Sequence, residues 1–196
     1  MVNTNKQGNR GEVIYEKEGG IARIILNRPD KLNAVSEEML YEELPAALHE
    51  AEEDDEVKVV IIKGAGRSFC SGFDLNMPYR IYQKREGISD KERPNQRVRL
   101  KFDRYFTSFN QSILLFPKIT IAQVHGHCIA EGATIAEQCD ITIVADDAQI
   151  SHAEQRLGFA GAGENLIPLF AMLGYKKARI MVLTGDSMDG VEAERI

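Results

Sequence analysis

A run of small residues interrupted by one glutamate is the part of the sequence most suggestive of chemistry. The stretch HGHCIAEGATIAEQCD, residues 125–140, reads as a tight turn that enters a short helix. Small residues in such a turn indicate that the backbone comes close to something else. Glu131 adds bulk and charge at this place. The question is therefore what the turn approaches, and whether it tolerates a glutamate.

A second segment has the same design. The apolar run 57–63 leads into SFCSGFDL, and the apolar run 119–124 leads into GHCIAEGA. In α/β sheets, ligands favour the crevice outside the carboxyl ends of the strands. A turn that enters a helix points free backbone N–H groups outward. Two such turns facing each other would direct two N–H donors at one oxygen, which is an oxyanion hole. As an equal alternative, both turns are ordinary connections.

The elements that must position these turns alternate between strand and helix. The segment EVIYEKEGGIARIILN predicts a β-hairpin, and Ser36 predicts the N-cap of a helix that runs to about Asp54 with a kink at Pro45. Residues 76–97 are polar and weakly periodic, which indicates a mobile or loosely helical segment. Further strands are expected at 57–63, 119–124 and in DITIVAD, and helices at 97–116, 132–138, 165–173 and 176–183. This order predicts an α/β fold with a largely parallel sheet.

Length and composition indicate one soluble domain over residues 1–196. Hydrophobic residues make up 43% of the chain and charged residues 28%, and the net charge is −6. The negative charge argues against a general nucleic-acid or membrane-surface binder. No apolar run is long enough to span a bilayer, and the N-terminus lacks the apolar segment of a secretory signal, so we expect a cytoplasmic protein. The chain stops just after a short helix begins near Asp189, which indicates a truncated C-terminal region.

Two other interpretations of these motifs have weaker support. HGHC contains three potential metal ligands, but no second cluster completes a tetrahedral site, so we expect no metal. Cys70, Cys128 and Cys139 have no CxxC spacing, which suits a reducing compartment. No neighbouring spacing supports Cys70 as a nucleophile, and a buried structural thiol is the preferred interpretation.

Several motifs together resemble one family. NRPDKLNAVS, GRSFCSGFDL and AQVHGHCIAEGATIAEQCDITIVADDAQISHAEQRLGFAGAG are similar, in order and spacing, to the crotonase superfamily, which is the enoyl-CoA hydratase/isomerase family. The resemblance covers essentially the whole chain. It implies a crotonase-like spiral of ββα units and a homotrimer or dimer of trimers. It also implies an acyl-CoA thioester as substrate, with coenzyme A as part of the substrate and no separate cofactor.

The resemblance also assigns the reacting groups. It places the oxyanion hole at the backbone N–H groups of Phe73 and Glu131, and a general acid/base at Glu154. Classical hydratases have a second glutamate, which falls here on Thr134, a residue that cannot titrate near neutral pH. The family also has glycine at Ala130 and at Glu131. Only the main chain of residue 131 is needed, so a side chain is allowed if it points away from the thioester.

Four residues are possible replacements for the missing glutamate or partners of the remaining one. His152 lies two residues before Glu154, so in an extended segment both face the same side. It either orients Glu154 or is a hydrogen-bonded surface histidine. The alternatives are the side chain of Glu131, if it turns inward, His127 near the pocket, and Glu164, which replaces a family glycine.

The coenzyme A part of the substrate is assigned by resemblance as well. It points to Lys31 and Leu32 in DKLNA and to Ser71, Gly72 and Asp74 in the second turn. Lys31 would meet a phosphate, and backbone groups near Leu32 and Ser71 would contact the adenine and pantetheine. Basic residues between Arg80 and Arg104 either add to phosphate attraction or form a solvated helix face, which we prefer for most of them.

The sequence therefore predicts an acyl-CoA-processing enzyme that polarises a thioester in a backbone oxyanion hole and moves protons with Glu154. The single carboxylate favours double-bond migration, or a lyase or hydrolase variant, over hydration guided by two glutamates. The alternative is a catalytically altered crotonase-fold protein that binds or acts as a scaffold. Thr134 favours the alternative, and Glu154 counts against it.

Overall fold

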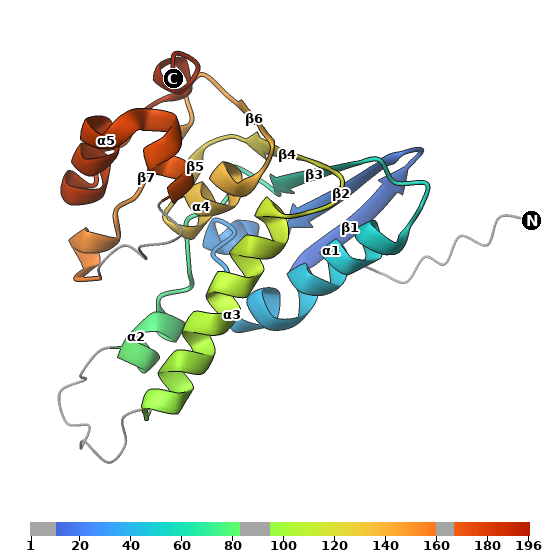
Figure 1. Ribbon diagram of the computed structural model, residues 1–196, viewed down its shortest axis with the longest axis horizontal. Helices are drawn as coiled ribbons and strands as arrows, with labels where there is room; N and C mark the ends of the chain where they lie inside the picture. The colour runs from blue at the N-terminus through green and yellow to red at the C-terminus, as the bar shows by residue number, and fades with distance from the viewer. Residues whose placement is uncertain (1–10, 83–94, 160–166) are drawn as a thin grey trace, which may run out of the picture.

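Five strands form the main sheet, in the order β1-β2-β3-β4-β6 (Figure 1). The computed structural model describes residues 11–82, 95–159 and 167–196. The strands are β1 (Val13–Glu18), β2 (Ile21–Leu26), β3 (Val59–Gly64), β4 (Ile119–Val124) and β6 (Ile141–Val144). Strand β1 is antiparallel to β2, as the predicted hairpin requires, and all the other pairs are parallel. The prediction of a largely parallel α/β sheet is confirmed.

A second, two-stranded sheet follows the carboxyl edge of the first. It pairs β5 (His127–Ile129) in parallel with β7 (Gln149–Ser151). An isolated bridge joins Cys70 to Cys128 and so ties the loop after β3 to β5. The turn of residues 70–74 and the turn before the next helix are thereby held next to each other.

The helices cover the sheet and supply the walls around these turns. They are α1 (Leu44–Glu53), α2 (Asn76–Tyr82), α3 (Gln96–Leu114), α4 (Glu131–Gln138), α5 (Ile167–Thr184) and α6 (Gly190–Ala193). Short 3-10 helices lie at Pro29–Lys31 and Glu154–Leu157. The helix expected from Ser36 is present, and the Ser36 hydroxyl accepts the N–H of Met39. A π-helical turn, Met39–Glu43, precedes α1, because Pro45 has no N–H to give to the carbonyl four residues before it.

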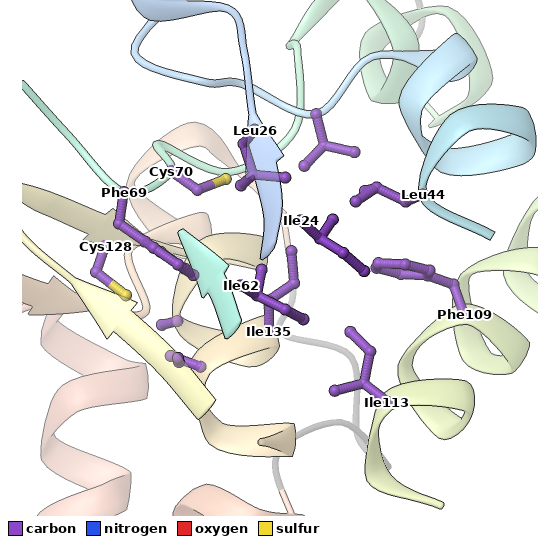
Figure 2. Packing of buried hydrophobic residues seen from close by; sticks show 14 of the residues in the cluster. Ile24, Leu26, Leu44, Ile62, Phe69, Cys70, Phe109, Ile113, Cys128 and Ile135 are labelled. Carbon is purple, nitrogen blue, oxygen red and sulfur yellow. The ribbon is translucent and has the colours of Figure 1, made fainter. Parts of the chain in front are cut away.

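The core lies between the sheet and helices α1, α3 and α4 (Figure 2). Ile24, Leu26 and Ile62 point from β2 and β3 toward these helices, which contribute Leu44, Phe109, Ile113 and Ile135. Phe69, Cys70 and Cys128 close the core beneath the two turns. Each fully buried side chain of this kind contributes roughly 1.5–3 kcal/mol, so the turns rest on a rigid base.

The loop after β2 is fixed to the loop after β3 by one side chain. Asn33 is buried, and its Nδ2 donates to the carbonyls of Ala65 and Ser68 at 2.8 and 2.7 Å. Its Oδ1 accepts the N–H of Arg28 at 2.9 Å. Because Asn33 has φ 56°, a conformation that asparagine tolerates well, the residue type fits both the backbone and the contacts.

Three main-chain hydrogen bonds continue this connection toward the second turn. The N–H of Ser71 donates to Leu32 O, that of Val35 to Gly72 O, and that of Asp74 to Val35 O, at 3.0, 2.8 and 2.9 Å. The segment 32–35 therefore runs parallel to the segment 71–74. The DKLNA loop and the turn that carries Phe73 form one unit.

The last predicted helices are present in the described residues. The element labelled α5 consists of two helices joined across a kink at Gly174, where φ is 71° and ψ is 163°, which confirms the two helices expected at 165–173 and 176–183 from Ile167 onward. Residues 76–82 are helical, which agrees with the looser prediction for 76–97, whereas 83–94 lie outside the described residues. Among the helices that the structure describes, none has the length and apolar content needed to cross a membrane.

Candidate active site

One pocket of about 520 Å³ lies at the carboxyl edge of the sheet. This volume falls in the ordinary range for small-molecule sites. The pocket is lined by Ser71 and Phe73 from the first turn, by Ala130, Glu131 and Thr134 from the second turn and α4, by Glu154, and by Phe102, Asp103 and Phe106 from α3. Sequence segments about 80 residues apart therefore meet at one site, as the predicted strand topology requires.

The two turns touch at Gly72. A Cβ atom placed on Gly72 would lie 3.0 Å from Cβ of Ala130 and 3.7 Å from the amide nitrogen of Glu131. Gly72 has φ 96°, a conformation that L side chains rarely adopt. Glycine is thus required here both by the backbone and by the close approach of the second turn. The next amide along the chain is that of Phe73.

The predicted oxyanion-hole amides are those of Phe73 and Glu131. Within the described residues, the N–H groups of Phe73 and Glu131 donate no hydrogen bond to the backbone. Glu131 is the first residue of α4, where the N–H groups have no intrahelical acceptor and the helix dipole is positive. Both residues line the pocket.

Ala130 holds a strained backbone at the start of α4. Its φ of 52° and ψ of −116° lie in a region used almost only by glycine. Its N–H donates to Ser151 O at 2.9 Å, which fixes the turn against β7. The surrounding contacts therefore impose a glycine conformation on an alanine.

The side chain of Glu131 is buried rather than directed into solvent. The residue is 2% exposed, and its Oε1 has no hydrogen-bond partner among the described residues. Burial raises the pKa of this carboxyl well above its ordinary value. Asn110 and His152 act to lower this pKa, and Glu154 acts to raise it further. Burial thus favours the neutral acid at this position.

Glu154 belongs to a group of three titratable side chains. Its Oε1 lies 3.6 Å from Nδ1 of His152, and Nε2 of His152 lies 2.8 Å from Oε1 of Glu137. His152 is 1% exposed, so the interpretation as a surface histidine is wrong: the ring is enclosed between α4 and the segment that carries Glu154. Burial lowers the pKa of His152, but the hydrogen bond to Glu137 and the negative charges of Glu137 and Glu154 outweigh burial and raise it to about 10.

Thr134, which the resemblance aligns with a hydratase glutamate, lines the pocket. Its hydroxyl donates to the carbonyl of Ala130 at 3.3 Å, one turn earlier in the chain. It can therefore offer a hydroxyl oxygen to a ligand, but no proton that titrates near neutral pH.

Of the residues predicted to bind coenzyme A, some lie at the pocket and others lie outside its lining. Ser71 lines the pocket, and Gly72 lies between the two turns. Lys31 is exposed at the end of its 3-10 helix, and Leu32 follows it with φ 51°. Asp74 already pairs with Arg28 at 3.1 Å. Burial would raise the pKa of Asp74, but the Arg28 guanidinium and the Asn76 groups hold it below its usual value. Its carboxylate thus has a structural partner.

The remaining predicted residues lie apart from this group. His127 is exposed on β5 and is not among the pocket-lining residues, and Glu164 lies outside the described residues. Cys70 is buried, and burial raises the pKa of its thiol to about 12, which fits a structural thiol. Over residues 11–82, 95–159 and 167–196, no group of three or more His, Cys, Asp or Glu side chains is placed to hold a metal.

Sequence reasoning missed two residues of the site. Asp103 lines the pocket from α3, and Glu137 pairs with His152 from the last turn of α4. The spacing of Glu137 carried a signal, since Glu131, Thr134 and Glu137 recur every three residues along one helix. Asp103 stands on a helix predicted only from its apolar residues, so its position gave no comparable signal.

Comparison with known proteins gives consistent results. Residues 16–196 match the sequence model of a family described as enoyl-CoA hydratase/isomerase. The peroxisomal Delta(3,5)-Delta(2,4)-dienoyl-CoA isomerase of Arabidopsis thaliana is 32% identical over 177 residues, covering 90% of this chain and 63% of the plant protein. The 1,2-epoxyphenylacetyl-CoA isomerase of Escherichia coli is 30% identical over 183 residues, covering 92% and 65%. The chain thus spans less than two thirds of the length of both relatives.

Solved structures agree with the sequence matches. An enoyl-CoA hydratase/isomerase structure from Xanthobacter autotrophicus superposes with a TM-score of 0.80 at 35% identity, covering 95% of this chain and 64% of the other. An enoyl-CoA hydratase from Mycobacterium smegmatis gives a TM-score of 0.80 at 26% identity, covering 94% and 66%. The similarity therefore extends over nearly all of this chain.

Proposed function

The chain belongs to the enoyl-CoA hydratase/isomerase family, and we propose that the full-length protein is an enzyme that moves protons on an acyl-CoA thioester with Glu154. The observation that carries this proposal is the common pocket: Glu154 and the turns of Phe73 and Glu131 line the same cavity of about 520 Å³. A thioester bound there would have a carboxylate on one side and two unused amides near its oxygen.

The amides of Phe73 and Glu131 are proposed to bind the thioester oxygen. Removal of a proton beside a thioester, or in conjugation with it, places negative charge on that oxygen as an enolate. N–H donors fixed before the reaction stabilise this charge more than they stabilise the neutral substrate, and one such donor contributes roughly 2.7–4 kcal/mol. The contact between the two turns at Gly72 supports this role, since it brings the two main chains together.

Glu154 is proposed as the group that carries the proton. As a carboxylate it takes a proton from one carbon of the acyl chain, and the electron pair moves into the enolate. As the resulting acid it returns the proton to another carbon of the conjugated system. The double bond migrates, and Glu154 ends as a carboxylate again, so no further reactant is needed.

Double-bond migration is favoured over hydration at this site. Thr134, which stands where a hydratase has its second glutamate, offers only a hydroxyl that is engaged with Ala130 O. Ser71, Gly72 and the Lys31–Leu32 loop are proposed to meet the coenzyme A part. A homotrimer or dimer of trimers and a cytoplasmic location stay predictions of the resemblance.

A substitution at Glu154 tests the proposal. The full-length protein and its Glu154→Gln variant are incubated with a panel of enoyl-CoA esters in D₂O. Chromatography separates the isomers, and mass spectrometry follows deuterium uptake. General acid–base catalysis contributes about 10²–10⁴-fold, so we expect a loss of this order with binding retained. Glu52→Gln, an exposed glutamate of α1, is the matched control. Unchanged turnover in Glu154→Gln would contradict the assignment.

Thr134 supports a second candidate, a protein that binds acyl-CoA esters without converting them. This candidate predicts that calorimetry detects binding of CoA esters by the full-length protein, while no ester of the panel is converted or exchanges deuterium. Turnover of any ester that depends on Glu154 would exclude it.

A further inference from the structure

Glu137 is a buried charged residue that the proposed mechanism does not use. Its side chain is 7% exposed in the last turn of α4, and it does not line the pocket. Glutamates are rarely buried unless they have a partner, because a lost hydration shell must be replaced. Its Oε1 contacts Nε2 of His152 at 2.8 Å, the length of a charge-assisted hydrogen bond. Its Oε2 has no partner among the described residues.

The other nitrogen of His152 faces Glu154. With Nε2 engaged by Glu137, Nδ1 is left at 3.6 Å from Glu154 Oε1 and has no hydrogen-bond partner among the described residues. This distance is longer than a hydrogen bond, although catalytic contacts are often long before a ligand binds. Glu154 is 26% exposed at the pocket. Glu137, His152 and Glu154 therefore form a row of contacts, in this order, from the interior of the protein to the pocket.

Titratable groups surround His152 on two sides. Glu131 and Glu137 face it from α4, and Glu154 from the adjoining 3-10 helix. Burial raises the pKa of Glu137, and His152 works in the opposite direction. A doubly protonated imidazole can donate to both Glu137 and Glu154 at once, whereas a neutral imidazole has one donor only. The geometry is therefore suited to a histidine that carries a positive charge between two carboxylates.

We propose that Glu137 is a positioning residue for proton transfer: through the His152 ring it holds the Glu154 carboxylate toward the acyl pocket. This inference rests on the proposed function of Glu154. The imidazole is fixed at one nitrogen by Glu137, so its other nitrogen meets Glu154 in one orientation.

The protonation of His152 is the first test, and it needs no catalysis. The full-length protein is labelled with ¹⁵N-histidine, and the ring resonances of His152 are identified by their loss in His152→Gln. We expect both ring nitrogens of His152 to stay protonated from pH 6 to above pH 8, and the ring to titrate at clearly lower pH in Glu137→Gln. A ring that titrates between pH 6 and 7 in the unsubstituted protein would overturn the inference.

Kinetics separate positioning from folding. A misplaced catalytic group costs on the order of 10–100-fold in rate, so Glu137→Gln should lower kcat by that order while KM stays within about twofold. The loss of charge on His152 should also move the alkaline limb of the pH profile to lower pH. Glu137→Asp, which keeps the carboxylate, should recover part of kcat, and thermal melting checks that each variant is folded. Glu52→Gln is again the matched control.

The outcomes distinguish this inference from the proposed function. If Glu154→Gln is inactive while Glu137→Gln has the kcat and pH profile of the unsubstituted protein, Glu137 has no positioning role and the function of Glu154 stands. If Glu154→Gln is fully active, the proposed function fails. The ¹⁵N titration alone then reports whether His152 carries a positive charge between Glu137 and Glu154.

Discussion

The carboxyl group of Glu131 lies in surroundings that favour its protonated form. It is buried beside α3, Oε1 is without a partner in the described structure, and the negative charges of Glu154 and Glu137 are near. In the proposed mechanism only the main-chain amide of this residue is used. Residue 131 thus combines a proposed role for its backbone with a side chain whose ionisation opposes folding.

Glu131→Gln separates these two roles. A raised folded-state pKa means that the folded protein keeps a proton which the unfolded chain loses above its ordinary pKa of 4.5. The contribution of this group to the free energy of unfolding is then fully present below pH 4.5 and is lost as the pH rises toward the folded pKa. Because glutamine cannot ionise, the variant should gain stability relative to the unsubstituted protein between pH 5 and 8, while kcat stays within a few-fold. Urea unfolding at several pH values and turnover assays measure both.

Two results would contradict this view of Glu131. An equal stability difference at pH 5 and pH 8 would mean that the carboxyl is already ionised in the folded protein. A large loss of kcat would mean that the side chain itself takes part in proton transfer.

At the scale of the elements, the α4 turn stores strain that a single substitution can remove. Ala130 has φ 52° and ψ −116°, where a non-glycine residue costs of order 1–3 kcal/mol. We expect Ala130→Gly to raise the free energy of unfolding by about 1 kcal/mol, because glycine loses more chain entropy on folding and so recovers only part of the strain. Denaturant unfolding measures the change.

The opposite substitution in the same turn is the control. A Cβ on Gly132 would lie 2.5 Å from Cys70 O and 2.8 Å from Cys70 Cβ, and part of this contact is backbone that cannot move aside. Gly132→Ala should therefore destabilise the protein. Equal effects of the two substitutions would show that the conformation of Ala130 is not strained.

Strands and turns were predictable, and the direction of side chains was not. The apolar runs of β3 and β4 and their glycine turns fixed which backbones meet at the carboxyl edge. Residue spacing alone left open whether Glu131 or His152 points inward. Both are enclosed by α3, α4 and the segment of Glu154, which are close in space but distant in sequence, so no local pattern reports that enclosure.

At the scale of the whole molecule, Asn33 connects loops that follow different strands. It makes hydrogen bonds to three backbone groups, of Arg28, Ala65 and Ser68, within a buried environment. Nothing in NRPDKLNAVS beyond a loop tendency predicted this contact, because its partners lie 32 and 35 residues further along the chain. Long-range polar contacts of this kind are the part of the fold that sequence patterns report least.

Asn33→Ala should therefore be strongly destabilising. Each buried backbone group left without a partner costs about 1–3 kcal/mol, so we expect a loss of roughly 3 kcal/mol or more. Gln111→Ala, an exposed amide on α3, is the matched control and should change stability by less than about 0.5 kcal/mol. A loss below 1 kcal/mol for Asn33→Ala would mean that water replaces the missing amide.

The three main-chain bonds between residues 32–35 and 71–74 limit how this site can be rebuilt. A designer who imports the first of these segments from a relative, to accept a different thioester, also changes the anchor of the second. The two stretches are exchangeable only as a matched set. Swapping the first one alone would disturb the alignment of the amide at residue 73, even though no residue of that turn had been altered.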